Sequence, residues 1–197
     1  MNIRRMETAD CGIVVSIHQR SFKGFFLTYM GQAFLSTLYR STLSDPTGIA
    51  IVSESDGRIT GFVTGTTQPA GFYSRLLKNH LLPFAWGSIK GFLKRPSILP
   101  RLLRAFSMPK QILPKENCAT LMSIGVAPDI QGQGTGKMLV NAFLSEARNR
   151  GADYVNLTTD AVDNDATNHF YASLGFELFR EYTTPEGRVM NEYLIKL

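Results

Sequence analysis

The fold is decided by the stretch Ser123-Ile-Gly-Val-Ala-Pro-Asp-Ile-Gln-Gly-Gln-Gly-Thr-Gly-Lys-Met138. It opens as an apolar strand, passes through a glycine-rich turn, and continues into an amphipathic helix that we expect over residues 134–150. The first N–H groups of a helix have no partners within it, and glycines let an anion approach the backbone without a Cβ in the way. The turn therefore predicts an anion-binding site at the start of a helix.

Two familiar phosphate-binding motifs do not fit this turn. The P-loop pattern G-x-x-x-x-G-K-[ST] fails because Gln131 stands at its first glycine and Met138 follows the lysine. The dinucleotide fingerprint G-x-G-x-x-G fails because Lys137 stands where its third glycine should be. A third pattern, Q/R-x-x-G-x-G/A, fits fully with Gln131, Gly134 and Gly136. Alone it is a weak signal, because an ordinary glycine-rich turn can also cap a helix.

A second motif lies further along the chain, where Asn164 to Phe176 read Asn-Asp-Ala-Thr-Asn-His-Phe-Tyr-Ala-Ser-Leu-Gly-Phe. With the glycine-rich turn, this motif resembles the GNAT N-acetyltransferase superfamily. The turn is similar to the acetyl-CoA pyrophosphate loop of that family, and the second motif is similar to its N-x-x-[A/T]-N-x-F-Y-x-x-x-G-F helix. The resemblance covers residues 119–197 well, whereas residues 2–67 match only in the order of their elements.

The alternation of strand and helix patterns predicts an α/β (α+β) class. Strands are expected over residues 2–5, 48–54, 59–67, 119–126, 154–159, 177–182 and 189–195. The resemblance implies the GNAT fold, a mixed, mostly antiparallel sheet of about six to seven strands flanked by helices. We expect one domain over residues 1–197, with a basic helical insertion over about 68–115.

The resemblance also implies a binding site for acetyl-CoA as co-substrate, in a gap between the parallel strands 119–126 and 154–159. The backbone of Ile124 and Val126 would pair with the pantetheine arm like an added strand, and Asn164 would bind the end of that arm. Gly125 is expected to mark a bulge that frees an N–H for the thioester carbonyl. The pyrophosphate would be held by the backbone amides of Gln131, Gly132, Gln133, Gly134, Thr135, Gly136 and Lys137.

The catalytic groups are only partly predicted. Tyr171 stands at the tyrosine position of the family and is the candidate general acid for the leaving thiolate, with core packing as the alternative. The strand before the turn carries no carboxylate, so the general base stays open. Water-relayed deprotonation is one alternative, and the side-chain candidates are Glu54, Asp56, Glu192 and His80. His18 and His169 are interpreted as structural or solvated.

The implied function is N-acetyl transfer from acetyl-CoA to a primary amine of a small-molecule acceptor, in one ternary complex. A faint resemblance to members of the family that act on amino sugars favours an amino sugar or a nucleotide amino sugar. The alternative is an acyl-CoA-binding module that has lost catalysis and serves a regulatory or interaction role.

The positive charge is concentrated in one segment. The net charge is +5, yet residues 57–115 carry ten Lys or Arg and no Asp or Glu. A solvated helical lid, a site for an anionic acceptor and a contact with a membrane surface all fit this pattern. Nucleic-acid binding is disfavoured, because the aromatic residues of the segment alternate with Leu and Ile as in buried helices.

The remaining composition gives expectations about the compartment. No apolar run approaches the length of a membrane-spanning helix. Glu7 and Asp10 lie where a signal peptide would be apolar, so we expect a cytoplasmic protein. Cys11 and Cys118, with three His, match no metal-ligand spacing, so no metal site is expected and both cysteines are interpreted as small apolar residues.

Overall fold

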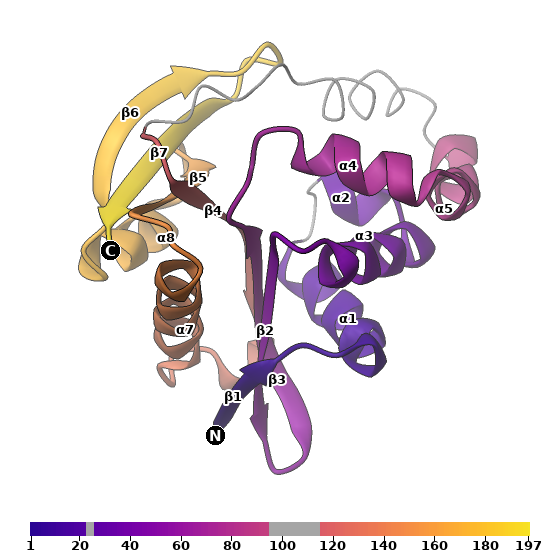
Figure 1. Cartoon of the computed structure of the whole chain (residues 1–197), viewed down its shortest axis with the longest axis horizontal. Helices are drawn as coiled ribbons and strands as arrows, with labels where there is room; N and C mark the ends of the chain where they lie inside the picture. Colours follow the sequence, from indigo (N-terminus) through magenta and orange to yellow (C-terminus); the bar gives the residue numbers. More distant parts are fainter. Residues whose placement is uncertain (23–25, 95–114) are drawn as a thin grey trace.

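The computed structural model describes residues 1–22, 26–94 and 115–197. Its centre is a seven-stranded sheet in the order β1-β2-β3-β4-β5-β7-β6 (Figure 1). Only β4 and β5 pair in parallel, and all other pairs are antiparallel, which confirms the predicted mixed sheet. The strands are β1 (Asn2–Arg5), β2 (Gly48–Ser55), β3 (Arg58–Thr66), β4 (Cys118–Val126), β5 (Tyr154–Asp160), β6 (Glu177–Thr183) and β7 (Val189–Lys196).

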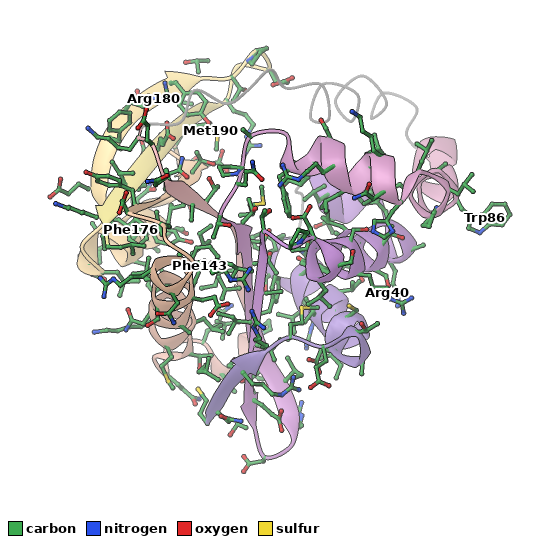
Figure 2. All side chains as sticks on the ribbon, in the orientation of Figure 1. Arg40, Trp86, Phe143, Phe176, Arg180 and Met190 are labelled. Carbon is green, nitrogen blue, oxygen red and sulfur yellow. The ribbon has the colours of Figure 1, made fainter. Side chains whose placement is uncertain are left out.

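Helices cover both faces of the sheet (Figure 1). One face carries α1 (Cys11–Ser21), α2 (Phe26–Tyr29), α3 (Gln32–Ser44), α4 (Phe72–Asn79) and α5 (Leu81–Lys94). The other carries α7 (Thr135–Asn149) and α8 (Asp165–Ser173), and Phe143 and Phe176 lie on this side (Figure 2). Each layer buries its own apolar cluster, and burial of such surface is the main stabilising term.

The sheet opens in its middle. β4 and β5 pair only where Cys118, Ala119 and Thr120 meet the first three residues of β5. Beyond that point the two parallel strands have no shared ladder, so their carboxyl-terminal halves diverge. Ligands of sheets with parallel strands commonly bind at such carboxyl ends.

The segment between β3 and β4 follows the predicted helical pattern in its described part. α4 and α5 lie there, and residues 95–114 of the predicted insertion fall outside the described residues. α5 packs on α3, where the rings of Phe84 and Phe34 lie 5.2 Å apart. Pro83 is accommodated because it lies in the first turn of α5, where a missing N–H breaks no helical hydrogen bond. Among the described residues, no helix is long and apolar enough to cross a membrane.

The amino-terminal strand is tied to the first helix by one ion pair. The Asp10 carboxylate accepts hydrogen bonds from Arg4 Nη1 at 2.8 Å and Arg4 Nη2 at 3.0 Å, and a third from the Glu7 N–H at 2.8 Å. These bonds, chiefly those from Arg4, hold the pKa of Asp10 below its ordinary value. A carboxyl whose pKa is lower in the folded state stabilises the fold above its unfolded pKa, and this stabilisation is lost as the pH falls.

Asp10→Asn is therefore expected to lower the free energy of unfolding at pH 7 by about 1–3 kcal/mol, the range for a charged hydrogen bond. The difference from the unaltered protein should begin to shrink as the pH falls below about 4, where the unfolded carboxyl takes up a proton, and should vanish only once the folded carboxyl, whose pKa is lower, is protonated as well. Urea unfolding of both proteins at pH 7 and at a pH well below 4 measures the two free energies of unfolding. Asp129→Asn, at an exposed position, is the control. An equal loss at both pH values would contradict the ion-pair account.

Candidate active site

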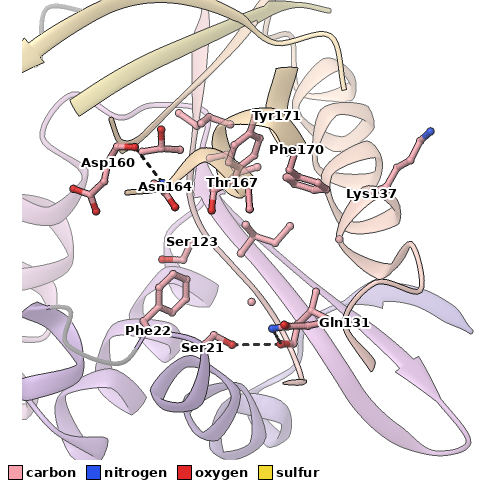
Figure 3. A pocket seen from close by; sticks show the side chains of 18 of the residues that line it. Ser21, Phe22, Ser123, Gln131, Lys137, Asp160, Asn164, Thr167, Phe170 and Tyr171 are labelled. Atoms are coloured by element: carbon pink, nitrogen blue, oxygen red, sulfur yellow. Dashed lines mark hydrogen bonds between the residues drawn. The ribbon is translucent and has the colours of Figure 1, made fainter. Parts of the chain in front are cut away.

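A cavity of about 870 Å³ lies where β4 and β5 diverge. Its wall comes from the end of α1, from β4, from the glycine-rich turn, from β5 and from α8 (Figure 3). The volume falls in the usual range of small-molecule sites. The cavity brings together all the predicted site residues except Gln133, which is exposed and not part of the described wall.

The backbone of β4 faces the gap at the predicted positions. The Ala127 N–H donates to the Thr60 carbonyl of β3 at 2.8 Å. Because backbone groups alternate along an antiparallel strand, those of Ile124 and Val126 turn away from β3 and toward the gap. Both residues line the cavity. This arrangement leaves a strand edge that an extended chain could pair with.

The glycine-rich turn leads into α7 through left-handed backbone. Gly132 and Gly134 both have φ of +81°, a region that side chains other than glycine rarely adopt. A Cβ on either would meet no atom within 4 Å, so the space above the turn is open. The N–H groups of the first turn of α7 have no helical acceptors and lie on the cavity wall. The Lys137 side chain points away from the other labelled residues, so its backbone is the part turned to the site (Figure 3).

Two side chains hold the exit of β4. The Val126 carbonyl accepts hydrogen bonds from Gln131 Nε2 at 3.3 Å and from Ser21 Oγ at 3.4 Å (Figure 3). They connect the glycine-rich turn and α1 to the same point on the strand. The Gln131 side chain thus ties the turn to the end of β4, which gives the first position of the Q/R-x-x-G-x-G/A pattern a structural role.

Tyr171 lies on the cavity wall and is only 4% exposed. Its ring packs edge-on against Phe170 and Phe176, at centroid distances of 5.1 and 5.6 Å. Burial raises the pKa of Tyr171 above its ordinary value, so the phenol keeps its proton at neutral pH. The side chain can therefore donate a proton or a hydrogen bond, and it is also packed in the core.

The asparagines of the second motif fasten α8 to the end of β5. Asn164 Nδ2 donates to the Asp160 carbonyl at 3.2 Å, and Asn168 Nδ2 donates to the same oxygen at 3.1 Å. Asn168 Oδ1 accepts a 2.6 Å hydrogen bond from Thr159. Asn164 also lines the cavity, so the motif both fixes α8 and supplies a polar group to the site.

The bulge predicted at Gly125 is wrong: the irregularity in β4 lies at Met122. Gly125 pairs in register with Phe62, and the irregularity lies earlier, where Met122 is the extra residue between the pairs of Leu121 and Ser123. Gly125 is instead a close-packing position, since a Cβ there would lie 2.7 Å from the ring of Phe62. The break in alternation at Met122 depends on the pairing with β3, which a single strand pattern does not reveal.

The four side chains considered as the general base lie outside the described cavity wall: Glu54, Asp56, Glu192 and His80. In the described part of the chain, the cavity wall includes one carboxylate, Asp160, and none of the four. Glu54 is paired with Arg4 at 2.9 Å, and His80 contacts Ser44 at 3.1 Å. Asp56 lies in the turn between β2 and β3.

Glu192 and Asp160 are both engaged by arginines. Glu192 is 4% exposed and accepts from Asn156 Nδ2 at 2.7 Å and from Arg180 Nε at 2.6 Å. Asp160, which sequence reasoning missed, accepts from Arg188 Nη2 at 2.6 Å, and Arg188 also lines the cavity. Neither pair is visible as a motif, because Arg180 and Glu192 lie on different strands and Arg188 lies in the turn before β7, far in sequence from Asp160.

A buried polar chain, also missed, reaches the cavity from α1. His18 Nδ1 lies 2.6 Å from the Tyr39 hydroxyl, and the side chain of Ser123 on the cavity wall hydrogen-bonds Tyr39. Burial lowers the pKa of His18 to about 4, so the imidazole is neutral at pH 7. His18 is thus held in the core beneath the site and is not solvated.

Comparison with known proteins agrees with this geometry. Residues 13–176 match the acetyltransferase (GNAT) family. The match covers most of the chain, and the chain therefore belongs to the GNAT family.

Solved structures show the same fold at low identity. The chain is 16% identical to ribosomal-protein-alanine N-acetyltransferase of Brucella melitensis, with a TM-score of 0.65 over 100% of both chains. It is 14% identical to an N-acetyltransferase of Staphylococcus aureus, with a TM-score of 0.63 over 99% of this chain and 97% of that one. At these identities the likeness concerns the fold alone.

Two curated relatives match over short stretches. The mycothiol acetyltransferase of Thermobifida fusca is 42% identical over 69 residues, which are 35% of this chain and 21% of the relative. That of Rhodococcus jostii is 41% identical over 56 residues, 28% of this chain and 18% of the relative. The chain thus spans about a fifth of the length of these curated relatives.

Proposed function

We propose that the protein transfers the acetyl group of acetyl-CoA to a primary amine of a small-molecule acceptor. The observation that carries the proposal is the gap between β4 and β5. It begins at a free strand edge, ends at the glycine-rich turn before α7, and has the Tyr171 side chain on its wall. The family membership implies acetyl-CoA as the co-substrate.

The site fits acetyl-CoA at both ends. The open space above Gly132 and Gly134 leaves room for phosphate oxygens beside the unpaired N–H groups of α7. The N–H and carbonyl of Ile124 and the N–H of Val126 face the strand edge, as pairing with a pantetheine arm requires, whereas the Val126 carbonyl already accepts from Gln131 and Ser21. Asn164 adds a polar side chain nearby. Bound acetyl-CoA supplies an activated thioester.

Residues of the cavity wall then assist the transfer of the acetyl group to the amine. A neutral amine attacks the carbonyl carbon, so that a C–N bond forms, the C–S bond breaks, and the thiolate leaves. Tyr171 donates its proton to the sulfur and is reprotonated from solvent. The amine proton leaves through water, because within the described cavity wall the one carboxylate, Asp160, is already paired with Arg188.

We propose an amino sugar as the acceptor. A nucleotide amino sugar would in addition carry the negative charge of its phosphates. The short matches to proteins named mycothiol acetyltransferase support a small-molecule acceptor. The net charge of +5 and the basic segment favour an acceptor that carries negative charge.

The acceptor class is tested by thiol release from acetyl-CoA in the presence of amino sugars, nucleotide amino sugars, amino acids or peptides. We expect nucleotide amino sugars to give the highest kcat/KM, and we expect their KM to rise with ionic strength because salt screens the attraction. The KM for a neutral amino sugar should change little and serves as the control. Fastest turnover with peptides, or a salt-independent KM for the nucleotide sugar, would contradict the assignment.

The alternative function is an acyl-CoA-binding module without catalysis. It is favoured by the absence of any carboxylate from β4, where some family members place a Glu. Such a module would bind CoA with the affinity of an enzyme but release no thiol with any amine of the panel. Turnover with one acceptor excludes it.

A further inference from the structure

The helices on one face of the sheet carry no acidic residue. Residues 11–44 and 57–115 contain no Asp or Glu, and α1 to α5 all fall within these ranges. Eleven of the 16 acidic residues lie beyond residue 115, in the part of the chain that forms the opposite layer and the strands β4 to β7. The helical layer formed by α1 to α5 therefore carries a positive charge, and the remainder of the chain is acidic.

The outer face of α5 is apolar and exposed. Leu82 is 81% exposed, Trp86 is 79% exposed and Leu81 is 58% exposed. Scattered single apolar residues need no explanation, but three large ones within two turns of one helix do. Trp86 points outward at the edge of the molecule, and the exposed Arg40 of α3 projects from the same edge (Figure 2).

The opposite face of α5 is anchored. Phe84 is 1% exposed and packs against Phe34 of α3. A Cβ on Gly87 would lie 3.0 Å from the backbone of Phe34, so the two helices approach closely there. Because the inner face fixes α5 on the core, the outer side chains are held outward rather than free to fold back.

We propose that this outer face of α5 docks the protein onto an anionic membrane surface. An interfacial helix needs an apolar face with an aromatic residue and cations beside it, and a tryptophan lies readily at the boundary between apolar and polar regions. Arg40 and Lys78 are exposed cations on the neighbouring helices α3 and α4. Anionic headgroups complement helices that carry no carboxylates of their own.

Protein partners fit this face less well. A second copy would bring another acid-free layer against it, and like charges repel. A peptide helix docks in a groove, whereas Leu82 and Trp86 project from the surface with about four-fifths of their area exposed. A bilayer accepts a projecting face of this kind, because it needs no complementary shape. The proposed contact is shallow and reversible, and it is independent of the identity of the acetyl acceptor.

The chain contains its own probe, since Trp86 is the one tryptophan in the sequence. We expect the full-length protein to co-sediment with vesicles made of equal parts of phosphatidylcholine and phosphatidylglycerol, and the tryptophan emission to shift to the blue on binding. Acrylamide should then quench this emission less. Binding to phosphatidylcholine alone should be much weaker, and added salt should weaken binding to the anionic vesicles.

Leu82→Glu is the test variant, because it places a charge on the docking face and keeps the fluorescent probe. Its partition onto anionic vesicles should fall by about tenfold or more, since one leucine no longer enters the apolar boundary. Leu178→Glu is the matched control, with the same chemical change at a 56% exposed leucine on β6, and should bind as the unaltered protein does. Circular dichroism and thermal unfolding verify that both variants fold.

Several results would overturn the proposal. These are the absence of co-sedimentation, co-sedimentation with unchanged tryptophan emission, equal binding to neutral vesicles, and equal losses in the two variants. A blue shift that grows with protein concentration in the absence of lipid would assign the face to a second copy instead. Thiol release in solution is measured separately, so failure of membrane binding leaves the proposed acetyl transfer untouched.

Discussion

Tyr171→Phe is expected to lower kcat by about 10²- to 10⁴-fold, the usual effect of losing a general acid–base group. The phenol lies on the cavity wall, and burial raises its pKa and keeps it protonated. Without the hydroxyl, the thiolate must leave unprotonated or take a proton from water. Thiol release at saturating acetyl-CoA and acceptor measures kcat, and calorimetry should show nearly unchanged binding of CoA.

Tyr193→Phe is the matched control for this variant. Tyr193 is 6% exposed and belongs to the same apolar cluster, with its ring 6.4 Å from that of Tyr171, but it is not part of the described cavity wall. It should therefore lose a buried hydroxyl without losing turnover. Normal turnover in Tyr171→Phe, or an equal loss in both variants, would make Tyr171 a packing residue.

Gly134→Asp is expected to abolish binding of CoA. The new carboxylate would stand in the open space above the turn, where we place the pyrophosphate. Two unit charges 4 Å apart interact by about 4 kcal/mol at an intermediate effective dielectric, which corresponds to about a thousandfold in Kd. Isothermal titration calorimetry with CoA measures this on protein whose circular dichroism spectrum is unchanged.

Two further variants separate charge from backbone strain. Gly134→Asn has nearly the same size and tolerates positive φ equally well, so it should weaken CoA binding much less than the aspartate. Gly57→Asp places the same residue at a φ of +72° in the turn between β2 and β3, away from the cavity, and should bind CoA normally. If Gly134→Asp binds CoA with undiminished affinity, the pyrophosphate does not lie at this turn.

The fold was predictable because its informative signals are local. The turn containing Gly132 and Gly134 is a strand exit and a helix start within one short stretch, and its glycines are required by the left-handed backbone that the structure shows there. The alternation of strand and helix patterns around it was enough for the mixed sheet. The described part of the segment between β3 and β4 was likewise recognisable as helical from composition.

The parts of the site that could not be predicted depend on pairs distant in sequence. Ser123, Tyr39 and His18 meet through the packing of two helices against β4, and no spacing in the chain records that contact. The pairing of Asp160 with Arg188 joins the end of β5 to the turn that precedes β7. The Met122 bulge was missed for a related reason, because register is a property of two strands together.

The central claim is that acetyl-CoA lies in the gap between β4 and β5 and ends on the glycine-rich turn. Amide hydrogen exchange with and without acetyl-CoA tests it most directly, because exchange reports which backbone N–H groups become protected. The account predicts added protection confined to residues 124–126, residues 131–137 and the start of α8. Unchanged exchange in residues 131–137 at saturating acetyl-CoA, or protection confined to another part of the molecule, would contradict it.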